Sequence, residues 1–367
     1  MFEVKSAPSP AKESVLIAMS GGVDSSAAAC LLVESGFTCA GAMMKLFDNE
    51  AIGQDKGRPC CTLADAGDAR AVADALGIPF FVFNFTDSFA AQVMDRFADT
   101  YRRGWTPNPC IDCNRFLKFD RLLRRAAELG YDRVATGHYA RVAREGERYL
   151  LKRGLDAAKD QSYVLYAMTQ AQLARTLFPV GELRKPQVRA LAEARGFVNA
   201  AKRDSQDICF VPDGDYGVFL ERYLGQPLPT GRFVDTQGRT LGTHRGYMRY
   251  TVGQRRGLGV SADQPLYVKE IRPEDNTVVL AHDEDLYGKT LTARDINLIP
   301  IPRLDGPLRV TAKLRYKHAE QPATVWQTGA DELRVTFDAP QRAITRGQAV
   351  VLYDGETVVG GGTIVSP

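Results

Sequence analysis

Two groups of residues in this 367-residue chain have the composition of chemical sites. One is a glycine turn, Ser20-Gly21-Gly22-Val23-Asp24-Ser25-Ser26, and the other is a set of cysteines, Cys110, Cys113 and Cys209. Glycines let the backbone approach a ligand closely, and free N–H groups at a helix start attract anions. The turn therefore predicts a phosphate site, with Asp24 as a candidate ligand for a metal that bridges phosphates. It is not a Walker A loop, because no lysine follows Gly22.

The cysteines are candidates for metal, redox or nucleophilic chemistry rather than for structural disulfides. The chain has no apolar run of membrane-spanning length and no signal-peptide core, so we expect a cytoplasmic protein with reduced thiols and no membrane partner. The basic surroundings of Cys209 favour its thiolate, and a buried structural cysteine is the alternative. Cys30 and Cys39 are expected in the core. Cys60-Cys61 could complete a zinc site.

The glycine turn must be held between a strand and a helix. The apolar run 15–19 predicts a buried strand, and Ala27 to Glu34 predicts a helix ended by Gly36. Further strands at 37–45, 80–85 and 133–140 alternate with helices, which indicates a parallel α/β sheet. Ligands bind at the carboxyl ends of such strands, where Gly22, Met44 and Gly137 fall.

Three domains are expected from the length and the change in pattern. They are a Rossmann-like parallel-sheet domain of the adenine nucleotide α-hydrolase type at 1–210, a small β-rich domain at 211–287 and an antiparallel β-barrel at 288–367. Two prolines within 104–115 predict a loop that carries two thiols, and 230–259 is interpreted as short strands. The net charge of +3 neither requires nor excludes a nucleic-acid partner.

Ser-Gly-Gly-x-Asp-Ser resembles the pyrophosphate loop of the N-type ATP pyrophosphatases. With several other stretches in the same order, nearly the whole chain resembles the tRNA-specific 2-thiouridylase family. The further matching stretches are Thr106-Pro107-Asn108-Pro109, Cys113-Asn114, Ala135-Thr136-Gly137-His138-Tyr139-Ala140, Lys159-Asp160-Gln161-Ser162-Tyr163, Cys209-Phe210, Tyr250-Thr251-Val252-Gly253-Gln254-Arg255 and Gly360-Gly361-Gly362.

The resemblance implies an enzyme that uses ATP and Mg²⁺ to adenylate the C2 oxygen of the wobble uridine in tRNA and then replaces that oxygen with sulfur. It implies ATP contacts at Ala18, Met19, Ser20, Gly21, Gly22, Val23, Asp24, Ser25, Met44 and Gly137. It implies tRNA contacts at Asn108, Pro109, Cys110, His138, Lys159, Asp160, Gln161, Arg315, Tyr316 and Gln348. For His138, a packed histidine at a strand end is the alternative.

In the family's persulfide scheme, the cysteine matching Cys209 carries the terminal sulfur and the cysteine matching Cys113 releases it, leaving a disulfide between them. The sulfur comes from a donor such as a cysteine desulfurase or a sulfur-relay protein. Many members have an Asp where this chain has Cys110, which leaves the proton-handling group open. Cys110, Cys113 and Cys209 could instead hold a [4Fe–4S] cluster with one open iron, and this alternative stays open.

Two rival functions follow from the same residues. A pyrophosphate-loop ligase acting on a small molecule would release pyrophosphate without tRNA and would tolerate loss of both Cys113 and Cys209. A non-catalytic RNA-binding protein with a relic nucleotide fold would bind tRNA with a steep salt dependence and without ATP turnover.

Overall fold

The computed structural model describes residues 13–48, 63–202, 208–211 and 214–367. The chain forms two compact units. The first comprises Met1–Gln92, Cys110–Pro212 and Glu356–Val358, and the second comprises Val93–Pro109, Asp213–Gly355 and Val359–Pro367. Within the described residues, no helix is both long and apolar enough to cross a membrane.

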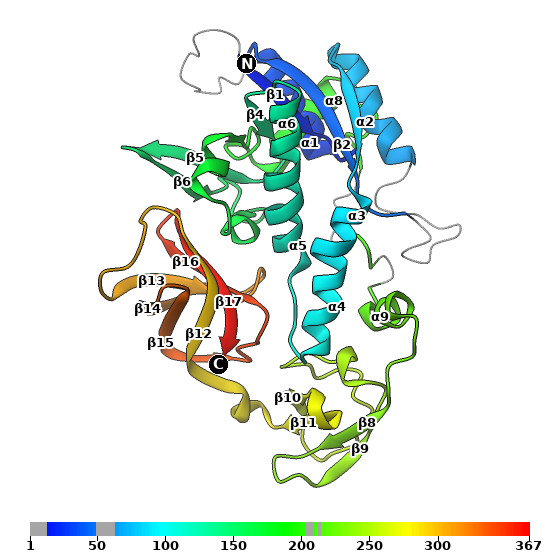
Figure 1. Ribbon diagram of the computed structural model, residues 1–367, viewed down its shortest axis with the longest axis vertical. Coiled ribbons are helices and arrows are strands. Elements are labelled where there is room, and N and C mark those ends of the chain that lie inside the picture. Colours follow the sequence, from blue (N-terminus) through cyan, green and yellow to red (C-terminus); the bar gives the residue numbers. More distant parts are fainter. Residues whose placement is uncertain (1–12, 49–62, 203–207, 212–213) are drawn as a thin grey trace. The chain divides into compact units, whose positions relative to one another are not determined.

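The first unit is built on a parallel sheet with the strand order β3-β2-β1-β4-β7, which confirms the predicted Rossmann-like architecture. Figure 1 shows helices α1, α2, α6 and α8 gathered around these strands. The sheet and its helices are β1 (Ser14–Ala18), α1 (Val23–Glu34), β2 (Thr38–Lys45), α2 (Leu63–Leu76), β3 (Phe80–Asn84), α6 (Leu122–Glu128), β4 (Arg133–Ala135), β7 (Thr176–Leu177) and α8 (Lys185–Ala194).

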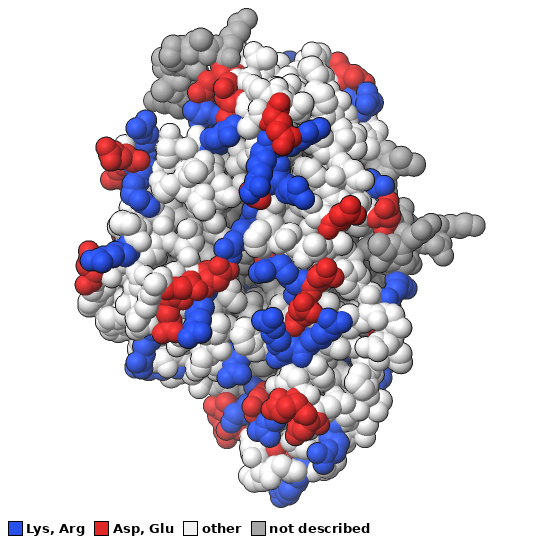
Figure 2. Space-filling model, viewed as in Figure 1, with Lys and Arg blue, Asp and Glu red and all other residues white. Residues whose placement is uncertain are grey.

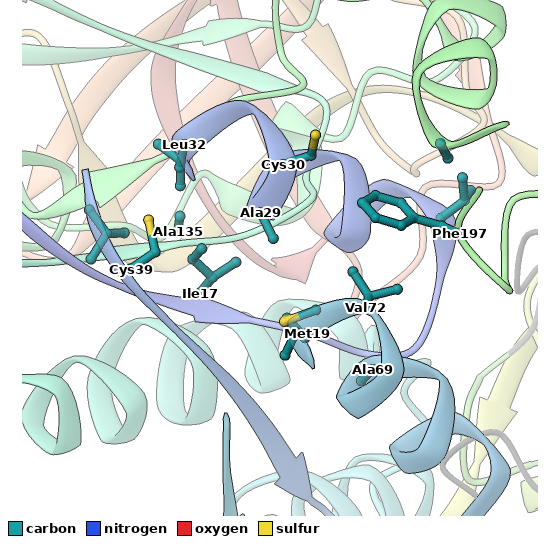
Figure 3. Close-up of a cluster of buried hydrophobic side chains, with 14 of the residues drawn as sticks. Ile17, Met19, Ala29, Cys30, Leu32, Cys39, Ala69, Val72, Ala135 and Phe197 are labelled. Atoms are coloured by element: carbon teal, nitrogen blue, oxygen red, sulfur yellow. The ribbon is translucent and has the colours of Figure 1, made fainter. Parts of the chain in front are cut away.

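The core of this unit forms because β1 is apolar on both faces, as expected for a central parallel strand. Figure 3 shows Ile17 and Met19 of the β1 segment packed against Ala29 of α1 and Val72 of α2. Cys30 and Cys39 belong to the same cluster, as predicted. Burial raises the pKa of the Cys39 thiol to about 11, so this thiol is not a candidate nucleophile.

Several short elements complete the first unit. They are α3 (Thr86–Phe89), α5 (Pro109–Asp112), the π-helix η3 (Cys113–Arg121), the hairpin strands β5 (Ala140–Glu145) and β6 (Arg148–Arg153), the 3₁₀-helix η4 (Ser162–Leu165) and α7 (Gln170–Ala174). The π-helix η2 (Ala90–Met94) connects α3 to α4 (Asp95–Arg102), which lies in the second unit.

Two sequence predictions of local structure were wrong. Residues 109–115 are helical rather than part of a loop, because Pro109 stands at the first position of α5, where a missing N–H costs nothing. Residues 250–257 form turns rather than strands, and Gly253 and Gly257 have the positive φ values of 87° and 76° that turns use.

The second unit contains a small sheet and a barrel. The small sheet has the order β10-β11-β8-β9, and strands β12, β15, β14, β13, β16 and β17 close into a barrel through the antiparallel β12–β17 pair. The elements are α9 (Tyr216–Leu224), β8 (Gly231–Val234), β9 (Thr240–His244), η5 (Tyr247–Arg249), β10 (Tyr267–Arg272), η6 (Pro273–Asp275), β11 (Thr277–Ala281), η7 (Asp283–Leu286), β12 (Tyr287–Leu298), β13 (Leu308–Lys313), β14 (Gln321–Gly329), β15 (Glu332–Arg342), β16 (Ala349–Asp354) and β17 (Thr357–Ser366).

Candidate active site

The glycine turn connects β1 to α1 in a conformation that requires glycine. Gly21 has φ +72°, and a Cβ there would lie 2.4 Å from the carbonyl oxygen of Asp65. Gly22 is extended and precedes the first residue of α1 without a side-chain cap, so the first N–H groups of the helix have no capping side chain. The Ser25 hydroxyl donates to the Gly22 carbonyl at 2.9 Å, which stiffens the turn from within.

The predicted nucleotide residues meet at one edge of the sheet. Ile17 of β1 pairs with Ala135 of β4, and Ala18 pairs with Ala42 of β2. Gly137 comes shortly after β4 and lies against the glycine turn. A Cβ at this position would be 2.6 Å from the Ser25 nitrogen. Met44 is half-buried near the end of β2. The carboxyl ends of three neighbouring strands therefore surround the turn, as in other open α/β sheets.

Asp24, the candidate metal ligand, is held by two side chains that the sequence did not reveal. The Lys185 ammonium donates to Oδ1 and Oδ2 of Asp24 at 2.7 and 2.8 Å. The Tyr139 hydroxyl donates to the same Oδ1 at 2.7 Å. The Asp24 side chain remains 29% exposed, so it is not closed off from a ligand.

A second pair of side chains attaches residues 199–202 to the turn. Asn199 Nδ2 donates to the Gly21 carbonyl at 3.0 Å and to the Ser26 hydroxyl at 2.9 Å. Lys202 Nζ donates to the same carbonyl at 3.1 Å and is paired with the carboxylates of Asp65 and Asp68. Partial burial alone would lower the pKa of Lys202, but the bonds to the two carboxylates raise it above its usual value.

Cys209 follows this anchored stretch and is half-buried. Phe210 beside it is buried, and its ring packs edge-on against Phe89 of α3 with centroids 5.6 Å apart. Phe89 in turn contacts Phe47, which follows β2, at 5.6 Å. The turn at Cys209 is thus held from the downstream side by an aromatic cluster at the carboxyl edge of the sheet.

Cys113 is the first residue of the π-helix η3 and is also half-buried with a free thiol. The neighbouring Asn114 is buried and donates to the carbonyl of Val164 at 3.1 Å, which fixes the start of the helix. η3 packs against α3, the helix that also carries Phe89. The segments that carry Cys113 and Cys209 therefore both contact α3, through η3 and through Phe210.

The charge that lowers the pKa of Cys113 comes from Lys118 on the same helix. Burial raises the pKa of the Cys113 thiol, Cys110 and Asp112 add to this, and the Lys118 ammonium opposes it. A π-helix bonds residue i to residue i+5, which places Cys113 and Lys118 on one face of η3. In an α-helix, residues five apart would face different directions.

Lys118 is in contact with His138. His138 is packed inside the protein after β4, which was the alternative to a tRNA contact. His138 is buried between Phe119 and Phe178, with ring centroids 5.9 Å away in each case. Burial and then the Lys118 charge lower the pKa of His138 well below its usual value. The neutral ring contacts Lys118 Nζ through Nε2 at 3.4 Å and Thr136 Oγ1 through Nδ1 at 2.7 Å.

The other tRNA candidates of the first unit lie along the chain that supports Tyr139. Gln161 Oε1 accepts from the Tyr139 N–H at 3.0 Å, and Asp160 accepts from the Gly154 and Ser162 N–H groups, each at 3.1 Å. Lys159 precedes them and is half-buried. Cys110 is exposed. As placed, Asp160 and Gln161 shape the loop, and their contact with tRNA stays a prediction.

The tRNA candidates of the second unit fall into two places. Gln348 Nε2 donates to the carbonyls of Thr106 and Pro107, both at 3.0 Å, so it holds the chain directly before Asn108 and Pro109. Arg315 donates to the carbonyl of Arg342 at 2.8 Å. Tyr316 is 37% exposed, and Lys313 lies 6.0 Å from the centre of its ring.

In the part of the chain that the structure describes, no group of side chains is arranged as a ligand set for a metal cluster. No three His, Cys, Asp or Glu side chains there are placed to share an ion, so Cys110, Cys113 and Cys209 do not fit a [4Fe–4S] cluster as arranged. Cys60 and Cys61, the candidates for a zinc site, lie outside the described residues.

On the face that Figure 2 shows, positive and negative side chains are mixed. Figure 2 shows Lys and Arg interspersed with Asp and Glu. On η3 and α6, for example, Arg124 pairs with Asp120 at 2.8 Å and Arg125 with Glu128 at 2.7 Å. The mixed surface matches the small net charge of the sequence.

Sequence reasoning missed the side chains that reach the site from later segments, namely Lys118, Lys185, Asn199 and Lys202. Lys118 lies five residues after Cys113, a spacing that signals proximity only when the helix is a π-helix. Lys185 and Asn199 could not be found from the sequence pattern, because their partners are distant in the chain. Lys185 lies 161 positions after Asp24, and Asn199 lies 178 positions after Gly21.

Three family descriptions match the chain in succession. Residues 13–213 match the "tRNA methyl transferase HUP domain", residues 217–282 the "tRNA methyl transferase PRC-barrel domain" and residues 288–364 the "Aminomethyltransferase beta-barrel domain". Among solved structures, a 4-thiouridine synthetase in complex with RNA and ATP aligns at 16% identity with a TM-score of 0.35, over 58% of this chain and 50% of that one. That score is too low to support a conclusion.

Curated relatives resemble the chain over nearly its whole length. The tRNA-specific 2-thiouridylase MnmA of Acetivibrio thermocellus is 49% identical, with 96% of this chain and 99% of the relative covered. That of Clostridioides difficile is 48% identical, with 95% and 97% covered. That of Symbiobacterium thermophilum is 50% identical, with 97% and 93% covered.

Proposed function

The chain belongs to the tRNA-specific 2-thiouridylase family, and from that membership we propose that it forms 2-thiouridine at the wobble position of tRNA, using ATP. The proposal rests on one observation above all. It needs the thiols of Cys113 and Cys209. The π-helix η3, which begins at Cys113, and the ring of Phe210, which follows Cys209, both contact α3, and Lys202 donates to the Gly21 carbonyl of the phosphate turn. These contacts support the proposal that activation by ATP and delivery of sulfur occur at one place.

The chemistry follows from the weakness of the uridine C2 carbonyl as an electrophile. The C2 oxygen attacks the α-phosphorus of ATP, and pyrophosphate leaves. The terminal sulfur of a Cys209 persulfide then forms a bond to C2. The Cys113 thiolate attacks Cys209 Sγ, which breaks the bond to the transferred sulfur and forms a Cys113–Cys209 disulfide. AMP leaves as C2 becomes a thiocarbonyl, and an external thiol must reduce the disulfide before the next turnover.

Mg²⁺ is the cation proposed to accompany the triphosphate. Mg²⁺ binds through one or two carboxylates together with phosphate oxygens, and Asp24 presents a partly exposed carboxylate at the turn. Asp24 would hold the ion, which supplies charge neutralisation for the phosphates when bound.

The proposed macromolecular partners are tRNA and a sulfur donor. The anticodon arm would contact Asn108, Pro109, Cys110, His138, Lys159, Asp160, Gln161, Arg315, Tyr316 and Gln348. A cysteine desulfurase or a sulfur-relay protein would supply the persulfide to Cys209, which is half-buried.

The decisive experiment incubates the purified chain with unmodified tRNA, ATP, Mg²⁺ and a persulfide donor, and measures 2-thiouridine by mass spectrometry after nuclease digestion. We expect product only when ATP is present, and none from Cys113→Ser or Cys209→Ser. Cys39→Ser is the matched control, because that thiol is buried in the core. Full activity of either active-site variant would contradict the role of that thiol, and pyrophosphate release without tRNA would favour the small-molecule ligase.

A cluster route is tested in the same preparations. Anaerobic purification followed by iron and sulfide analysis should give no stoichiometric iron, and Cys110→Ala should keep most of the activity. Stoichiometric iron that is lost in Cys110→Ala would instead establish the three cysteines as cluster ligands.

A further inference from the structure

Cys110 stands three residues before Cys113 in the same helical segment, and its thiol is free. We propose that Cys110 moves the disulfide of the reaction away from Cys209. It exchanges with the Cys113–Cys209 disulfide, forms a Cys110–Cys113 disulfide and releases Cys209 for the next persulfide. The inference rests on the proposed function, since it adds a step to that same reaction.

The spacing of Cys110 and Cys113 suits a disulfide between them. Cys110 is the second residue of α5, and η3 follows α5 without a break and begins at Cys113. Residues three apart in an α-helix have Cα atoms about 5 Å apart, within the range of about 4.4–6.8 Å that disulfides use. The spacing Cys-x-x-Cys is also that of thiol–disulfide oxidoreductases. A bond between the two sulfurs therefore needs little movement of the backbone.

The electrostatics of Cys113 indicate that the two thiols are neighbours. Burial raises the pKa of Cys113, the Lys118 ammonium lowers it, and Cys110 raises it further. An electrostatic influence weakens with distance, so Cys110 lies near Cys113. Ile111 and Asn114, on either side of Cys113, are buried. Their packing fixes the segment that presents both thiols.

Exposure distinguishes Cys110 from the other cysteines that the structure describes. Cys30 and Cys39 are buried, Cys113 and Cys209 are half-buried, and Cys110 is exposed. A reductant opens a disulfide by attacking one of its sulfurs, so the rate depends on access. A Cys113–Cys209 disulfide would join two half-buried residues, whereas a Cys110–Cys113 disulfide would include an exposed one. The exchange therefore brings the oxidised pair to a position that a reductant can reach.

The exchange step conserves atoms and electrons. The Cys110 thiolate attacks Cys113 Sγ, and the bond between Cys113 and Cys209 breaks with its electron pair leaving on Cys209 Sγ. One disulfide is consumed and one is formed, so no oxidant is needed. The external thiol that the proposed reaction already requires then reduces the Cys110–Cys113 disulfide. Cys209 is free to accept a new persulfide before that reduction takes place.

The test maps the disulfide after one turnover. The chain is loaded with persulfide by a cysteine desulfurase, desalted, and incubated anaerobically with unmodified tRNA and ATP without reductant. It is then blocked with N-ethylmaleimide, digested and analysed by mass spectrometry. We expect a Cys110–Cys113 disulfide and an alkylated Cys209 in the unsubstituted chain, and neither change in the absence of ATP. Cys110→Ser should give the same yield of 2-thiouridine but retain the Cys113–Cys209 disulfide.

Reloading of Cys209 gives a second measurement. When the desulfurase is added again without reductant, Cys209 of the unsubstituted chain should accept a second persulfide, and this reloading should be lost in Cys110→Ser. Excess dithiol should restore it, because the reductant then opens the Cys113–Cys209 disulfide directly. Cys39→Ser removes a buried thiol and is the control, which should behave as the unsubstituted chain does.

Cys110→Asp separates disulfide exchange from proton transfer. A carboxylate can carry a proton but cannot form a disulfide, so this variant should retain the Cys113–Cys209 disulfide as Cys110→Ser does. A first turnover that is lost in Cys110→Ser and restored in Cys110→Asp would overturn the proposal. A Cys113–Cys209 disulfide that persists in the unsubstituted chain would overturn it too, while leaving the proposed function intact. An unsubstituted chain that forms no 2-thiouridine would instead refute the proposed function, so the two failures are distinguishable.

Discussion

At Cys113, the Lys118 ammonium opposes the burial that raises the pKa of the thiol. Burial disfavours the Cys113 thiolate, and nearby Cys110 and Asp112 disfavour it further. Lys118 acts in the opposite direction, and a buried neutral His138 holds its ammonium in place. Since the thiolate is the reactive form of cysteine, the step proposed for Cys113 should depend on this charge.

We therefore expect Lys118→Met to shift the pH dependence of sulfur release. Loss of the ammonium raises the pKa of Cys113 further, so the rate of 2-thiouridine release in single turnovers should reach its half-maximum at a higher pH. Arg121→Met, on the same helix, is the control and should leave the midpoint where it is. An unchanged midpoint in Lys118→Met, with the rate merely lowered at every pH, would show that the ammonium does not act on the thiol.

His138 should make the first unit sensitive to acid. Its folded pKa lies below the unfolded value of about 6.5, so the unfolded chain binds a proton that the folded chain does not. The stability it contributes is fully present above about pH 6.5 and is lost as the pH falls towards the folded pKa. Hydrogen exchange of the β4 amides should therefore speed up between pH 7.5 and 5.5, after correction for the intrinsic rate. His138→Gln should lessen this change, and the exposed His282→Gln should not.

At the scale of elements, the site depends on close approaches between backbones. α1 begins directly against the residues that follow β4, and only glycine at position 137 permits this. The start of α1, whose N–H groups are proposed to receive the phosphates, is thus positioned by a neighbouring strand and by α8.

Gly137→Ala should weaken ATP binding. Its Cβ would lie 2.6 Å from the Ser25 nitrogen and 2.7 Å from the Asp24 carbonyl carbon, so the start of α1 must move. A strain of about 1–3 kcal/mol corresponds to a loss of affinity of about 5- to 150-fold. Gly67→Ala is the matched control, because nothing lies within 4 Å of its Cβ in α2. It should stabilise the chain by about 0.5–1 kcal/mol. Unchanged ATP affinity in Gly137→Ala would mean that the turn is not the nucleotide site.

The sequence was sufficient for the elements with strong local signals. The apolar run of β1, the glycine turn and the alternation of strands and helices predicted the parallel sheet and its ligand edge. Contacts distant in sequence were not predictable, as the pairing of Lys185 with Asp24 illustrates. The helix at 109–121 was missed because two prolines suggested a loop, although a proline at a first helical position favours a start. Nothing in the composition of 113–121 distinguishes a π-helix from an α-helix.

At the scale of the whole molecule, the candidate ATP residues lie in one unit and the candidate tRNA residues are divided between the two. The candidate nucleotide residues and the two candidate thiols belong to the first unit, together with part of the proposed tRNA contacts, whereas the candidates Arg315, Tyr316 and Gln348 belong to the second. Damage confined to the barrel should therefore affect tRNA and spare ATP.

Gly360→Ala tests this separation. Gly360 pairs with Leu298 where β17 closes the barrel on β12, and a Cβ there would lie 2.0 Å from the Asn297 carbonyl oxygen. We expect filter binding to show weaker tRNA affinity, with the dissociation constant for ATP unchanged. Gly329→Ala, whose Cβ would make an ordinary contact of 3.5 Å with Glu332, should change neither. Equal tRNA affinity in both variants would remove the barrel from the tRNA surface.

The way the two units share the chain also sets an order of events during synthesis. The segment Val93–Pro109 belongs to the second unit although it is translated between two stretches of the first. Its apolar partners come much later, since Tyr101 stacks on Tyr216 and Phe97 packs on Phe219. While the ribosome makes the intervening hundred or so residues, α4 must display Phe97 and Tyr101 to the surroundings, a state in which aggregation competes with folding. We therefore expect a chaperone to bind the nascent chain at this stage. Ribosome profiling of chaperone-bound nascent chains would detect this binding.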